Sequence, residues 1–491
     1  MDINKEVSTY LGQKGYTIYK ESLSMKEQEY IRNELSVKPY VPKSPVQPQP
    51  FPIYRESKYK FYVPKYFGIE NYGIPDEIRI DTPESINIEF KGELRELQRE
   101  IVNTYIKSAK TSGGGLIDIY CAAGKTVLSL NIISILKVKT LIIVHKGFLL
   151  NQWIERIKEF LPDARIGVIQ GQIIDIENKD IVIGMLQSLS MKEYPYTMFS
   201  SFGLTIADET HHLGSEIFSR SLQKIVTKYT LGLSATMQRK DGLTKVFKMF
   251  LGDIVYKGKR EQQDPVQIQG IVYETHDEEF NKTLVDYKGQ PAYSSMISKL
   301  CCYEKRSDFI IKIIKNEFYK NPNQQMMILG QNKNLLIHLY KEILSQNIAS
   351  VGYYLGGMKE HELKNSENKS IVIATYAMAS EGLDIKTLST LFLVTPRTDI
   401  TQAVGRILRV KHDRPLVIDL IDKHEVFQKQ WLKRKKFYDK NKYKILYTNN
   451  NLYNKNIWNV NPCDNLISND DNYNDNHKKD KLLNGNCLLD I

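Results

Sequence analysis

The stretch LIDIYCAAGKTVLSL, residues 116–130, decides how the rest of the sequence is interpreted. An apolar run leads into a turn of small residues, and Lys125-Thr126 then opens a segment of helical character. This order is typical of a phosphate-binding loop, in which backbone N–H groups and the positive end of a helix hold phosphates. The pattern predicts that Lys125 reaches the β- and γ-phosphates of a nucleotide and that the Thr126 hydroxyl holds Mg²⁺.

The loop departs from the usual pattern at one position. Ile119 stands where a glycine is expected, five residues before Gly124, so Gly124 is the only glycine inside the turn. A short motif of this kind also arises by chance, and its meaning depends on the motifs that accompany it along the chain. The turn residues assigned to nucleotide binding are Cys121, Ala122, Ala123 and Gly124.

Size and composition limit the class of protein. A chain of 491 residues favours about three domains, and 42% hydrophobic residues allow large cores. No apolar run reaches about 18 residues, and the N-terminus lacks a secretory pattern, so we expect a soluble cytoplasmic protein without a membrane span. The five irregularly spaced cysteines predict a reducing compartment without disulfides or zinc. The net charge of +11 is compatible with a polyanionic partner.

Two regions alternate apolar runs with amphipathic segments. The first, from about residue 116 to 236, contains LIDIY, TLIIV, DIVIG, LTIAD and LGLSAT, and the second contains QMMILG, SVGYYLG, SIVIAT, TLFLVT and PLVIDLID. Apolar strands separated by helices indicate parallel sheets covered on both faces, so the fold class is α/β. The predicted domains are an N-terminal accessory region (1–90), two α/β domains (91–255 and 256–446), and an Asn/Asp/Lys-rich tail (447–491) whose composition predicts disorder.

Two segments interleave cations with aromatic residues. Residues 1–38 look helical and precede a proline-rich stretch, after which residues 53–75, IYRESKYKFYVPKYFGIENYGIP, alternate tyrosines with basic residues. Such a run can stack on bases and contact phosphates, although the packed face of a strand is the commoner explanation. Residues 428–445, QKQWLKRKKFYDKNKYKI, leave a similar choice between a nucleic-acid-contacting helix and a solvated charged face.

Acidic and hydroxyl residues end two of the predicted strands. Asp208 and Glu209 follow LTIAD, where an ATP-hydrolysing site needs one carboxylate for Mg²⁺ and another to accept a proton from the attacking water. We assign these roles to Asp208 and Glu209 in that order. His211 and the hydroxyls of Ser234 and Thr236 are predicted to couple the nucleotide site to the rest of the chain.

The second α/β region carries QAVGRILR, residues 402–409. A helix would place Gln402, Arg406 and Arg409 on one face. Guanidinium groups presented in this way can stabilise the γ-phosphate in the transition state, an effect of about 10³ to 10⁵ in rate. Gly405 costs roughly 1 kcal/mol of helix propensity, which favours a site of close backbone approach over an ordinary surface helix.

In this order, AAGKT, DETH, SAT and QAVGRILR resemble the motifs of superfamily 2 helicases and translocases over about residues 91–425. The stretches TLIIVHKGFLLNQW, GLSATMQRKDGLTKVFKMFLG and ATYAMASEGLDIKTLSTLFLVTP are similar to the XPB-like branch, which includes helicases of large cytoplasmic DNA viruses and the poxvirus transcript-release helicase. FPIYRESKYKFYVPKYFG resembles the region before the core in the viral proteins. The resemblance implies two RecA-like domains, ATP and Mg²⁺ as cofactors, DNA or RNA and the transcription machinery as partners, and a place in the viral factory or virion.

The resemblance also implies roles for residues outside these motifs. Gln98 matches the adenine-reading glutamine, and Gly382 and Asp384 match the second-domain motif that contacts the nucleotide. Lys240 stands where XPB-like relatives have a glutamate between Arg and Asp, which leaves a duplex-wedging role of that trio open. The implied nucleic-acid contacts are His145, Lys146, Gln187, Ser188, Arg239, Gly356, Gly357 and Thr375.

The sequence supports three candidate functions. The first is an ATP-driven helicase or translocase that moves 3′ to 5′ on DNA in viral transcription or replication, as the XPB-like resemblance implies. The second is an RNA helicase, which the same motifs would build and which differs only in substrate. The third is a nucleic-acid-binding scaffold with an inactive ATPase. The presence of Lys125, Asp208, Glu209, Arg406 and Arg409 argues against the scaffold.

Overall fold

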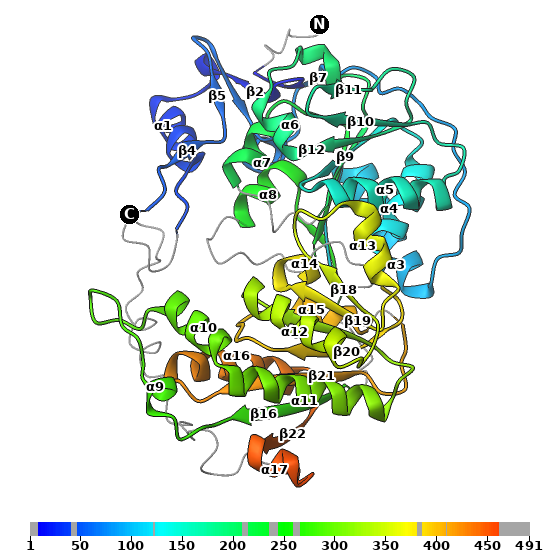
Figure 1. Cartoon of the computed structure of the whole chain (residues 1–491). Coiled ribbons are helices and arrows are strands. Elements are labelled where there is room, and N and C mark those ends of the chain that lie inside the picture. Colours follow the sequence, from blue (N-terminus) through cyan, green and yellow to red (C-terminus); the bar gives the residue numbers. More distant parts are fainter. Residues whose placement is uncertain are drawn as a thin grey trace, which may run out of the picture. The chain divides into compact units, whose positions relative to one another are not determined.

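The computed structural model divides into two compact units, Met1–Glu261 and Gln262–Ile491, and each is described by itself (Figure 1). The predicted boundary after residue 255 falls inside strand β15 (Ile254–Gly258), so the first unit extends beyond it. None of the described helices is long and apolar enough to cross a membrane. The structure describes residues 8–40, 47–120, 123–208, 215–234, 244–258, 266–380, 385–408 and 410–460.

The first unit contains an eight-stranded sheet in the order β11-β10-β12-β9-β13-β14-β8-β15. Its strands pair in parallel, except for the antiparallel β10–β11 pair, which confirms the parallel sheet predicted from the apolar runs. The strands not yet given bounds are β8 (Gly114–Ile119), β9 (Thr140–Val144), β10 (Ile166–Gln170), β11 (Ile173–Ile174), β12 (Ile181–Met185), β13 (Leu204–Ala207) and β14 (Tyr229–Ser234).

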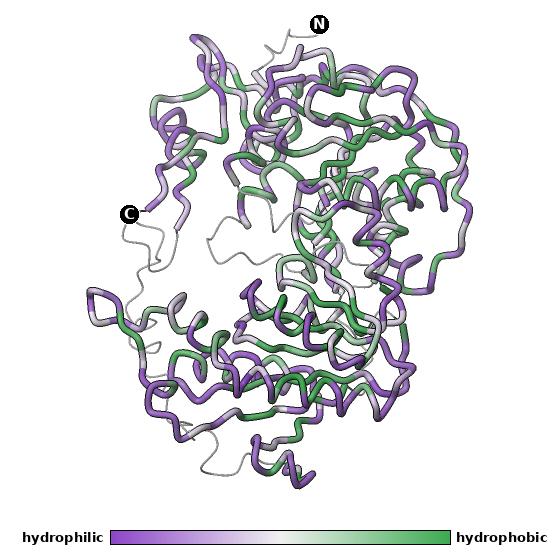
Figure 2. Tube along the Cα trace, in the orientation of Figure 1, coloured by the Kyte–Doolittle hydropathy of each residue, from purple (hydrophilic) through white to green (hydrophobic). Residues whose placement is uncertain are grey.

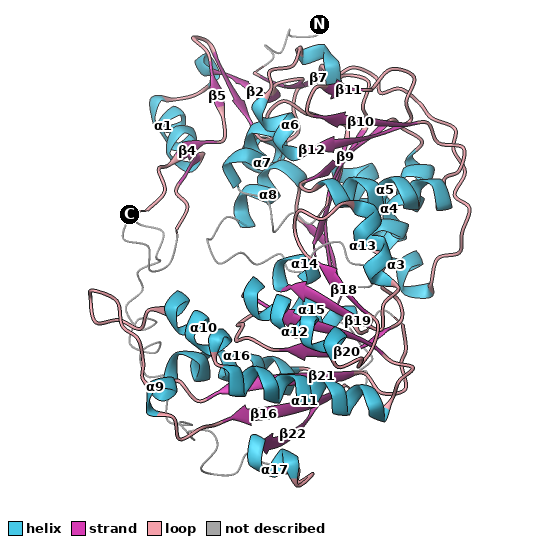
Figure 3. Cartoon of the chain, in the orientation of Figure 1, coloured by secondary structure: helices cyan, strands magenta, loops and turns pink. Residues whose placement is uncertain are grey.

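Both faces of this sheet are covered, and Figures 2 and 3 show apolar strands between helices. Successive strand residues enter different cores: Leu141 and Ile143 join the cluster that contains Phe218, whereas Ile142 joins the cluster that contains Trp153. This is the two-residue period of a strand that is buried on both faces. The covering helices are α3 (Glu96–Ser112), α4 (Lys125–Leu136), α5 (Gly147–Phe160), α6 (Leu186–Met191), α7 (Ser215–Leu222) and α8 (Thr244–Leu251).

The N-terminal region is a small module with its own sheet, in the order β5-β6-β2-β1-β7. The helical prediction for residues 1–38 is wrong in its first half, because a β-hairpin precedes the helix. In its second strand the buried apolar side chains of Tyr16 and Ile18 lie two residues apart, on either side of Thr17, which is the strand period rather than the helical one. The module consists of β1 (Thr9–Gly12), β2 (Gly15–Tyr19), α1 (Met25–Glu34), β3 (Ser36–Val37), β4 (Phe51–Pro52), β5 (Arg55–Glu56), β6 (Lys60–Val63), α2 (Lys65–Tyr72) and β7 (Glu77–Ile78).

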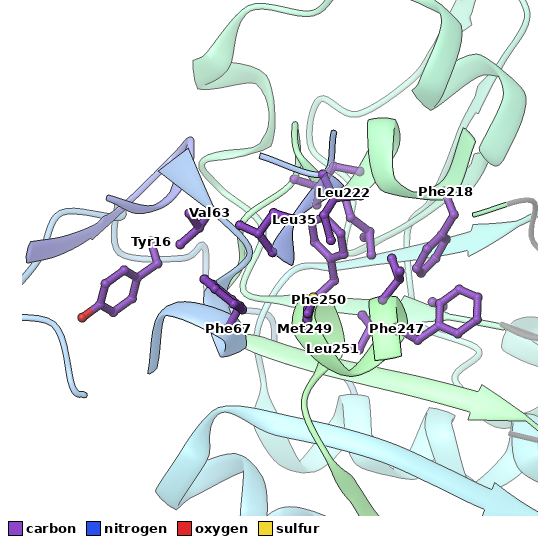
Figure 4. Close-up of a cluster of buried hydrophobic side chains, with 14 of the residues drawn as sticks. Tyr16, Leu35, Val63, Phe67, Phe218, Leu222, Phe247, Met249, Phe250 and Leu251 are labelled. Carbon is purple, nitrogen blue, oxygen red and sulfur yellow. The ribbon is translucent and has the colours of Figure 1, made fainter. Parts of the chain in front are cut away.

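The module shares one continuous core with the large sheet of the first unit. Tyr16, Val63 and Phe67 belong to the same buried cluster as residues of α7 and α8, as Figure 4 shows. Polar contacts reinforce this packing: the hydroxyls of Tyr66 and Thr230 lie 2.6 Å apart, and the Lys65 ammonium donates to the Lys228 carbonyl at 2.8 Å. Burial lowers the pKa of Lys65 to about 8. The module is therefore an integral part of the unit.

The second unit contains a seven-stranded parallel sheet in the order β18-β19-β17-β20-β21-β16-β22. Its strands are β16 (Gln267–Tyr273), β17 (Gln325–Gly330), β18 (Val351–Tyr354), β19 (Ile371–Thr375), β20 (Leu388–Leu393), β21 (Leu416–Asp422) and β22 (Lys444–Asn449). Its helices are α9 (Glu278–Asn281), α10 (Tyr293–Cys302), α11 (Glu304–Lys320), α12 (Lys333–Ser345), α13 (Glu360–Glu367), α14 (Tyr376–Ser380), α15 (Thr401–Arg406), α16 (Glu425–Lys440) and α17 (Asn450–Asn454).

The predicted tail begins inside this folded unit. Residues 447–460 are described, and β22 pairs along its length with β16, so the disorder prediction is wrong for that stretch. Tyr447 and Tyr453 are buried in the two cores of the unit, which offsets the polar composition of their neighbours. Residues 461–491 lie outside the described part of the chain.

The basic helix α16 packs its aromatic side chains inward. Trp431 and Tyr438 are fully buried, and Arg434 forms a buried ion pair with Asp419 in which the two nitrogen–oxygen distances are 2.8 and 2.9 Å. The Tyr438 hydroxyl also donates to Asp419 at 2.8 Å. Trp431 and Tyr438 are therefore core residues, and the lysines of α16 that are exposed leave the choice between a solvated charged face and a nucleic-acid contact open.

We expect Gly68→Ala to destabilise the first unit, although alanine is the better helix former. A Cβ at Gly68 in α2 would overlap the ring of Tyr16. Tyr16 is fully buried, and its hydroxyl donates to the Gly73 carbonyl at 3.1 Å, so the ring has little room to move. Overpacking of this kind costs about 1–3 kcal/mol in the free energy of unfolding, measurable by denaturant titration. Glu70→Ala on the exposed side of α2 is the control, and equal stability of both variants would contradict the packing.

Candidate ATP-binding and nucleic-acid site

Gly124 connects the end of the phosphate-binding turn to helix α4. Its φ of +83° lies in the left-handed region, which a residue with a Cβ adopts only with strain. A Cβ at this position would also overlap the side-chain amide nitrogen of Gln98. The backbone shape of the turn and its neighbour both require glycine here. The turn is thus a cradle of the form that suits close backbone approach to phosphates.

Gln98 connects helix α3 to this turn. Its side-chain nitrogen donates to the Ala123 carbonyl at 2.9 Å, and its side-chain oxygen accepts from the Arg95 backbone N–H at 3.0 Å. Gln98 is 3% exposed, so these bonds are protected from water. The first turn of α3 is therefore fixed against the loop that precedes α4.

Lys125 and Thr126 occupy the first turn of α4, and the positive end of a helix dipole favours an anion there. Both side chains are partly exposed, and the helix behind them is anchored by buried residues such as Leu128 and Leu130. The Ser129 hydroxyl donates to the Lys125 carbonyl at 2.8 Å. Cys121 and Ala122, also assigned to this site, lie outside the described residues.

Asp208 directly follows strand β13, next to β9 and β14 in the sheet. Its carboxylate accepts a 2.9 Å hydrogen bond from the indole N–H of Trp153 in α5. Asp208 is 7% exposed and Trp153 is 2% exposed, so this bond orients a buried carboxylate. The motifs in the sequence gave no role to Trp153, although it lies in the quoted stretch TLIIVHKGFLLNQW. An indole has only one polar atom, which usually finds a partner when buried, and this was the available signal.

Ser234 ends strand β14 and is fully buried, beside Asp118 of β8 in the register of the sheet. It therefore lies at the same edge of the sheet as the turn that follows β8. Three other residues predicted at or near this edge, Glu209, His211 and Thr236, lie outside the described residues.

The predicted nucleic-acid contacts of the first unit come together at the ends of neighbouring strands. His145 and Lys146 follow β9, and Gln187 follows β12, which pairs with β9. The Gln187 side chain donates to the His145 carbonyl at 3.1 Å, and the Ser188 hydroxyl accepts from the Gly171 N–H at 2.9 Å. Burial lowers the pKa of Lys146. Arg239 lies outside the described residues.

The second unit repeats this arrangement at the ends of β18 and β19. Gly356 and Gly357 follow β18, and both are exposed, with a φ of +91° at Gly357. Thr375 ends the adjacent strand β19, and its hydroxyl accepts from the Met378 N–H at 3.4 Å. The Met378 sulfur in turn approaches Gly356, so the three predicted contact residues share one edge of the sheet.

Helix α15 is shorter than predicted. It carries Gln402 and ends at Arg406, after which the Ile407 and Leu408 N–H groups bond to carbonyls three residues back. The described helical face therefore carries Gln402 and Arg406, and the expected place of Arg409 on it stays a prediction. Arg409, Gly382 and Asp384 lie outside the described residues.

Arg406 is held firmly at the end of α15. Its side-chain Nε donates to the Ala379 carbonyl at 2.7 Å, and the residue is 8% exposed. Ala379 belongs to α14, which follows Thr375, so the guanidinium is tied to the same edge of the second sheet. This hydrogen bond fixes the direction of the Arg406 side chain and therefore the position of its positive charge.

We expect Trp153→Phe to slow ATP hydrolysis by about 10-fold to 100-fold, because hydrogen bonds to charged groups contribute about 1.5–3 kcal/mol. Phenylalanine retains an apolar ring but cannot donate to Asp208. Steady-state turnover at saturating ATP is the measurement. Ile157→Val, one turn along α5 and fully buried, removes packing without a hydrogen bond and should retain turnover. An equal loss in both variants would assign the effect to packing.

Comparisons with known proteins agree with this geometry. The family model described as type III restriction enzyme, res subunit, matches residues 91–239. An ATP-dependent RNA helicase of Acanthamoeba polyphaga mimivirus is 34% identical over 471 residues, which are 92% of this chain and 90% of that protein. The DNA 3'-5' translocase XPB2 of Sulfurisphaera tokodaii is 25% identical over 405 residues, 73% of this chain and 89% of that protein.

The fold is also similar to a solved helicase structure. S. cerevisiae Dbp5 bound to RNA and ADP BeF3 aligns with a TM-score of 0.52 and 10% identity over 72% of this chain and 91% of Dbp5, a likeness of fold alone. The similarity to the mimivirus protein extends over nearly the whole of both chains and carries the assignment to a family. The chain belongs to the superfamily 2 helicases, in the XPB-like group with the helicases of large DNA viruses, and is an ATP-hydrolysing enzyme with two RecA-like domains.

Proposed function

We propose that this helicase moves 3′ to 5′ along DNA and serves viral transcription or replication. The observation that carries the proposal is the pair of anchored groups at one edge of the first sheet. There the Gly124 turn held by Gln98 and the Asp208 carboxylate held by Trp153 follow two strands that only β14 separates. The similarity to XPB2, which is named a DNA 3'-5' translocase, supports the choice of DNA and of direction.

The residues of this edge fit ATP with Mg²⁺. The turn through Cys121, Ala122, Ala123 and Gly124 would hold the phosphates, Lys125 would neutralise them, and Thr126 and Asp208 would hold the metal. The amide of Gln98 has two N–H donors, of which Ala123 takes one, and the other would read adenine. Glu209 would accept the proton of the attacking water.

Residues of the second unit would complete hydrolysis and link it to movement. Arg406 and Arg409 would stabilise charge on the γ-phosphate in the transition state, with Gln402 as a polar contact. Gly382 and Asp384 would contact the nucleotide from the second unit. His211, Ser234 and Thr236 would pass the state of the phosphates to the strand-binding residues.

The strand itself would be held by both sheet edges. His145, Lys146, Gln187, Ser188 and Arg239 would contact the backbone from the first unit, and Gly356, Gly357 and Thr375 from the second. Exposed glycine backbone can approach a phosphodiester closely, and hydroxyl and amide groups bind phosphates without reading sequence. A cycle of ATP hydrolysis that weakens and restores strand binding, first at one sheet edge and then at the other, would move the enzyme along the strand.

An RNA helicase is the second candidate. The observation that favours it is the similarity to the mimivirus protein, which is named "Putative ATP-dependent RNA helicase L396". The same motor residues would serve either substrate, so the distinction depends on contacts to the sugar, where the 2′-hydroxyl separates RNA from DNA. The inactive scaffold is excluded by the family assignment.

Lys125→Ala should abolish nucleic-acid-stimulated ATP hydrolysis and leave the fold intact. The lysine provides the positive charge at the phosphates, and its side chain is partly exposed, so its removal opens no core cavity. Phosphate release is measured with and without single-stranded DNA. Lys158→Ala, an exposed lysine of α5, is the charge-matched control and should behave as the wild type. Normal stimulated turnover in Lys125→Ala would overturn the assigned site.

Strand displacement on tailed duplexes tests substrate and direction together. We expect ATP-dependent displacement of DNA duplexes with a 3′ single-stranded tail and little with a 5′ tail. RNA duplexes with the same two tails are run in parallel, and Lys125→Ala provides the background without hydrolysis. Preference for RNA would establish the second candidate, and preference for 5′ tails would refute the proposed direction.

A further inference from the structure

The outer face of the N-terminal sheet is organised by its register. Arg55, Tyr62, Thr17, Tyr10 and Glu77 stand directly opposite one another across β5, β6, β2, β1 and β7. Directly paired residues point to the same side of a sheet. The intervening residues, such as Ile18 and Phe61, are fully buried on the other side. The row therefore lies on the opposite side of the sheet from this core: Glu77 is exposed, Arg55, Tyr62 and Tyr10 are partly exposed, and Thr17 at the centre is buried. The next row along pairs Tyr19 with Lys60.

Cations on this face lie over aromatic rings. The Lys60 ammonium lies 4.4 Å from the ring centre of Tyr19 and 5.1 Å from that of Tyr10, and it donates to the Tyr10 hydroxyl at 3.3 Å. The Arg79 guanidinium lies 4.1 Å from the Tyr10 ring. The cations act together on Tyr19, since hydrogen bonding from Lys60 and then from Arg79 lowers the pKa of that hydroxyl.

Lys14 extends the same face toward the large sheet. It lies in the turn between β1 and β2, 5.3 Å from the Tyr62 ring centre and 4.4 Å from that of Tyr196 in the 3-10 helix Tyr196–Phe199. A pocket borders this end of the face, with Lys14, Arg55 and Tyr62 in its lining. The charged face thus runs from the edge of the N-terminal module to the part of the first unit that contains the eight-stranded sheet.

Charge pairing separates three cations of this face from the other cations of the module, among them Arg79 on the face itself, which pairs with Glu77 at 2.6 Å. Lys20 and Arg32 both pair with Glu56, at 2.6 and 2.7 Å, and Lys245 of α8 pairs with Glu34 of α1. By contrast, Lys14, Arg55 and Lys60 have no carboxylate within 4.0 Å among the described residues. Aromatic rings hold Lys14 and Lys60 in place without cancelling their charge.

We propose that this face binds the phosphate backbone of a nucleic-acid duplex, at a site separate from the strand contacts proposed at the two sheet edges. Uncancelled cations favour a polyanion, and the enzyme family already acts on nucleic acid, so the proposal rests on the helicase assignment. Ammonium and guanidinium groups cover the tyrosine rings, which leaves little ring surface for stacking on unpaired bases. A duplex presents about twice the phosphate density of a single strand, so a face that reads charge alone favours the duplex.

The test uses the whole chain without nucleotide and a fluorescent blunt DNA duplex, titrated between about 50 and 200 mM salt. The variant Lys14→Gln/Arg55→Gln/Lys60→Gln should lose about tenfold or more in affinity, and the slope of log K against log salt should fall in magnitude by about 2 to 3. The control Lys26→Gln/Lys107→Gln/Lys110→Gln removes three exposed lysines of α1 and α3 and should retain the wild-type slope. Equal slope changes in both variants would overturn the proposal.

A charge-retaining variant separates the loss of charge from misfolding as the cause of weaker binding. Lys14→Arg/Arg55→Lys/Lys60→Arg should keep the duplex affinity and slope, and a loss of both would contradict binding by charge. A larger loss for a single strand of the same length would mean that the face stacks bases. Loss of polyglutamate binding with unchanged duplex affinity would mean that it holds an acidic protein segment. Either result refutes the duplex site. Strand displacement from 3′-tailed DNA is scored separately, so the failure of the motor proposal and the failure of this one are distinguishable.

Discussion

The close approach of Gln98 to Gly124 is the constraint on which the nucleotide site depends. One amide bonds both to the first turn of α3 and to the carbonyl just before Gly124, and no side chain fits between them. This contact ties α3 to the end of the loop at Ala123 and Gly124. Ile119 is still part of β8 and is buried at 1% exposure, so the chain needs no glycine freedom there. Gln98 of α3 thus fixes the described end of the turn.

A second constraint places all the chemistry at one edge of each sheet. The strands are buried on both faces, so polar side chains within them need buried partners, as Asp419 has in Arg434, and accessible polar groups gather where strands end. Asp208, Ser234 and His145 lie at strand ends of the first sheet, and Thr375 and Gly356 lie at strand ends of the second. In open parallel sheets ligands bind outside the carboxyl ends of the strands for this reason. The same rule therefore accounts for the nucleotide site and for the proposed strand contacts.

The sequence predicts the fold well where burial alone decides the structure. Strands that are apolar throughout, such as TLIIV and PLVIDLID, appear as β9 and β21. The sequence analysis missed two strands whose structure depends on their neighbours. These strands, β16 and β22, pair with each other at one end of the second sheet. Their sequences, QIQGIVY and KILYTN, carry polar residues that hide the strand pattern. The hydrogen bond from Trp153 to Asp208 joins α5 to the end of β13, and no local pattern reveals a contact 55 residues apart.

The difference between rings and carboxylates as partners for cations bears on the N-terminal module. An exposed ion pair contributes about 0–1 kcal/mol, and an exposed cation over a ring contributes about 0.5–1 kcal/mol. Folding stability therefore gives no reason to prefer a ring at Lys60 and a carboxylate at Lys20. What differs is the local charge, since Lys20 shares the Glu56 carboxylate with Arg32, whereas the tyrosines leave the charge of Lys60 intact. The cations without a carboxylate partner among the described residues keep a positive field on their face, and such a field acts only on a charged partner.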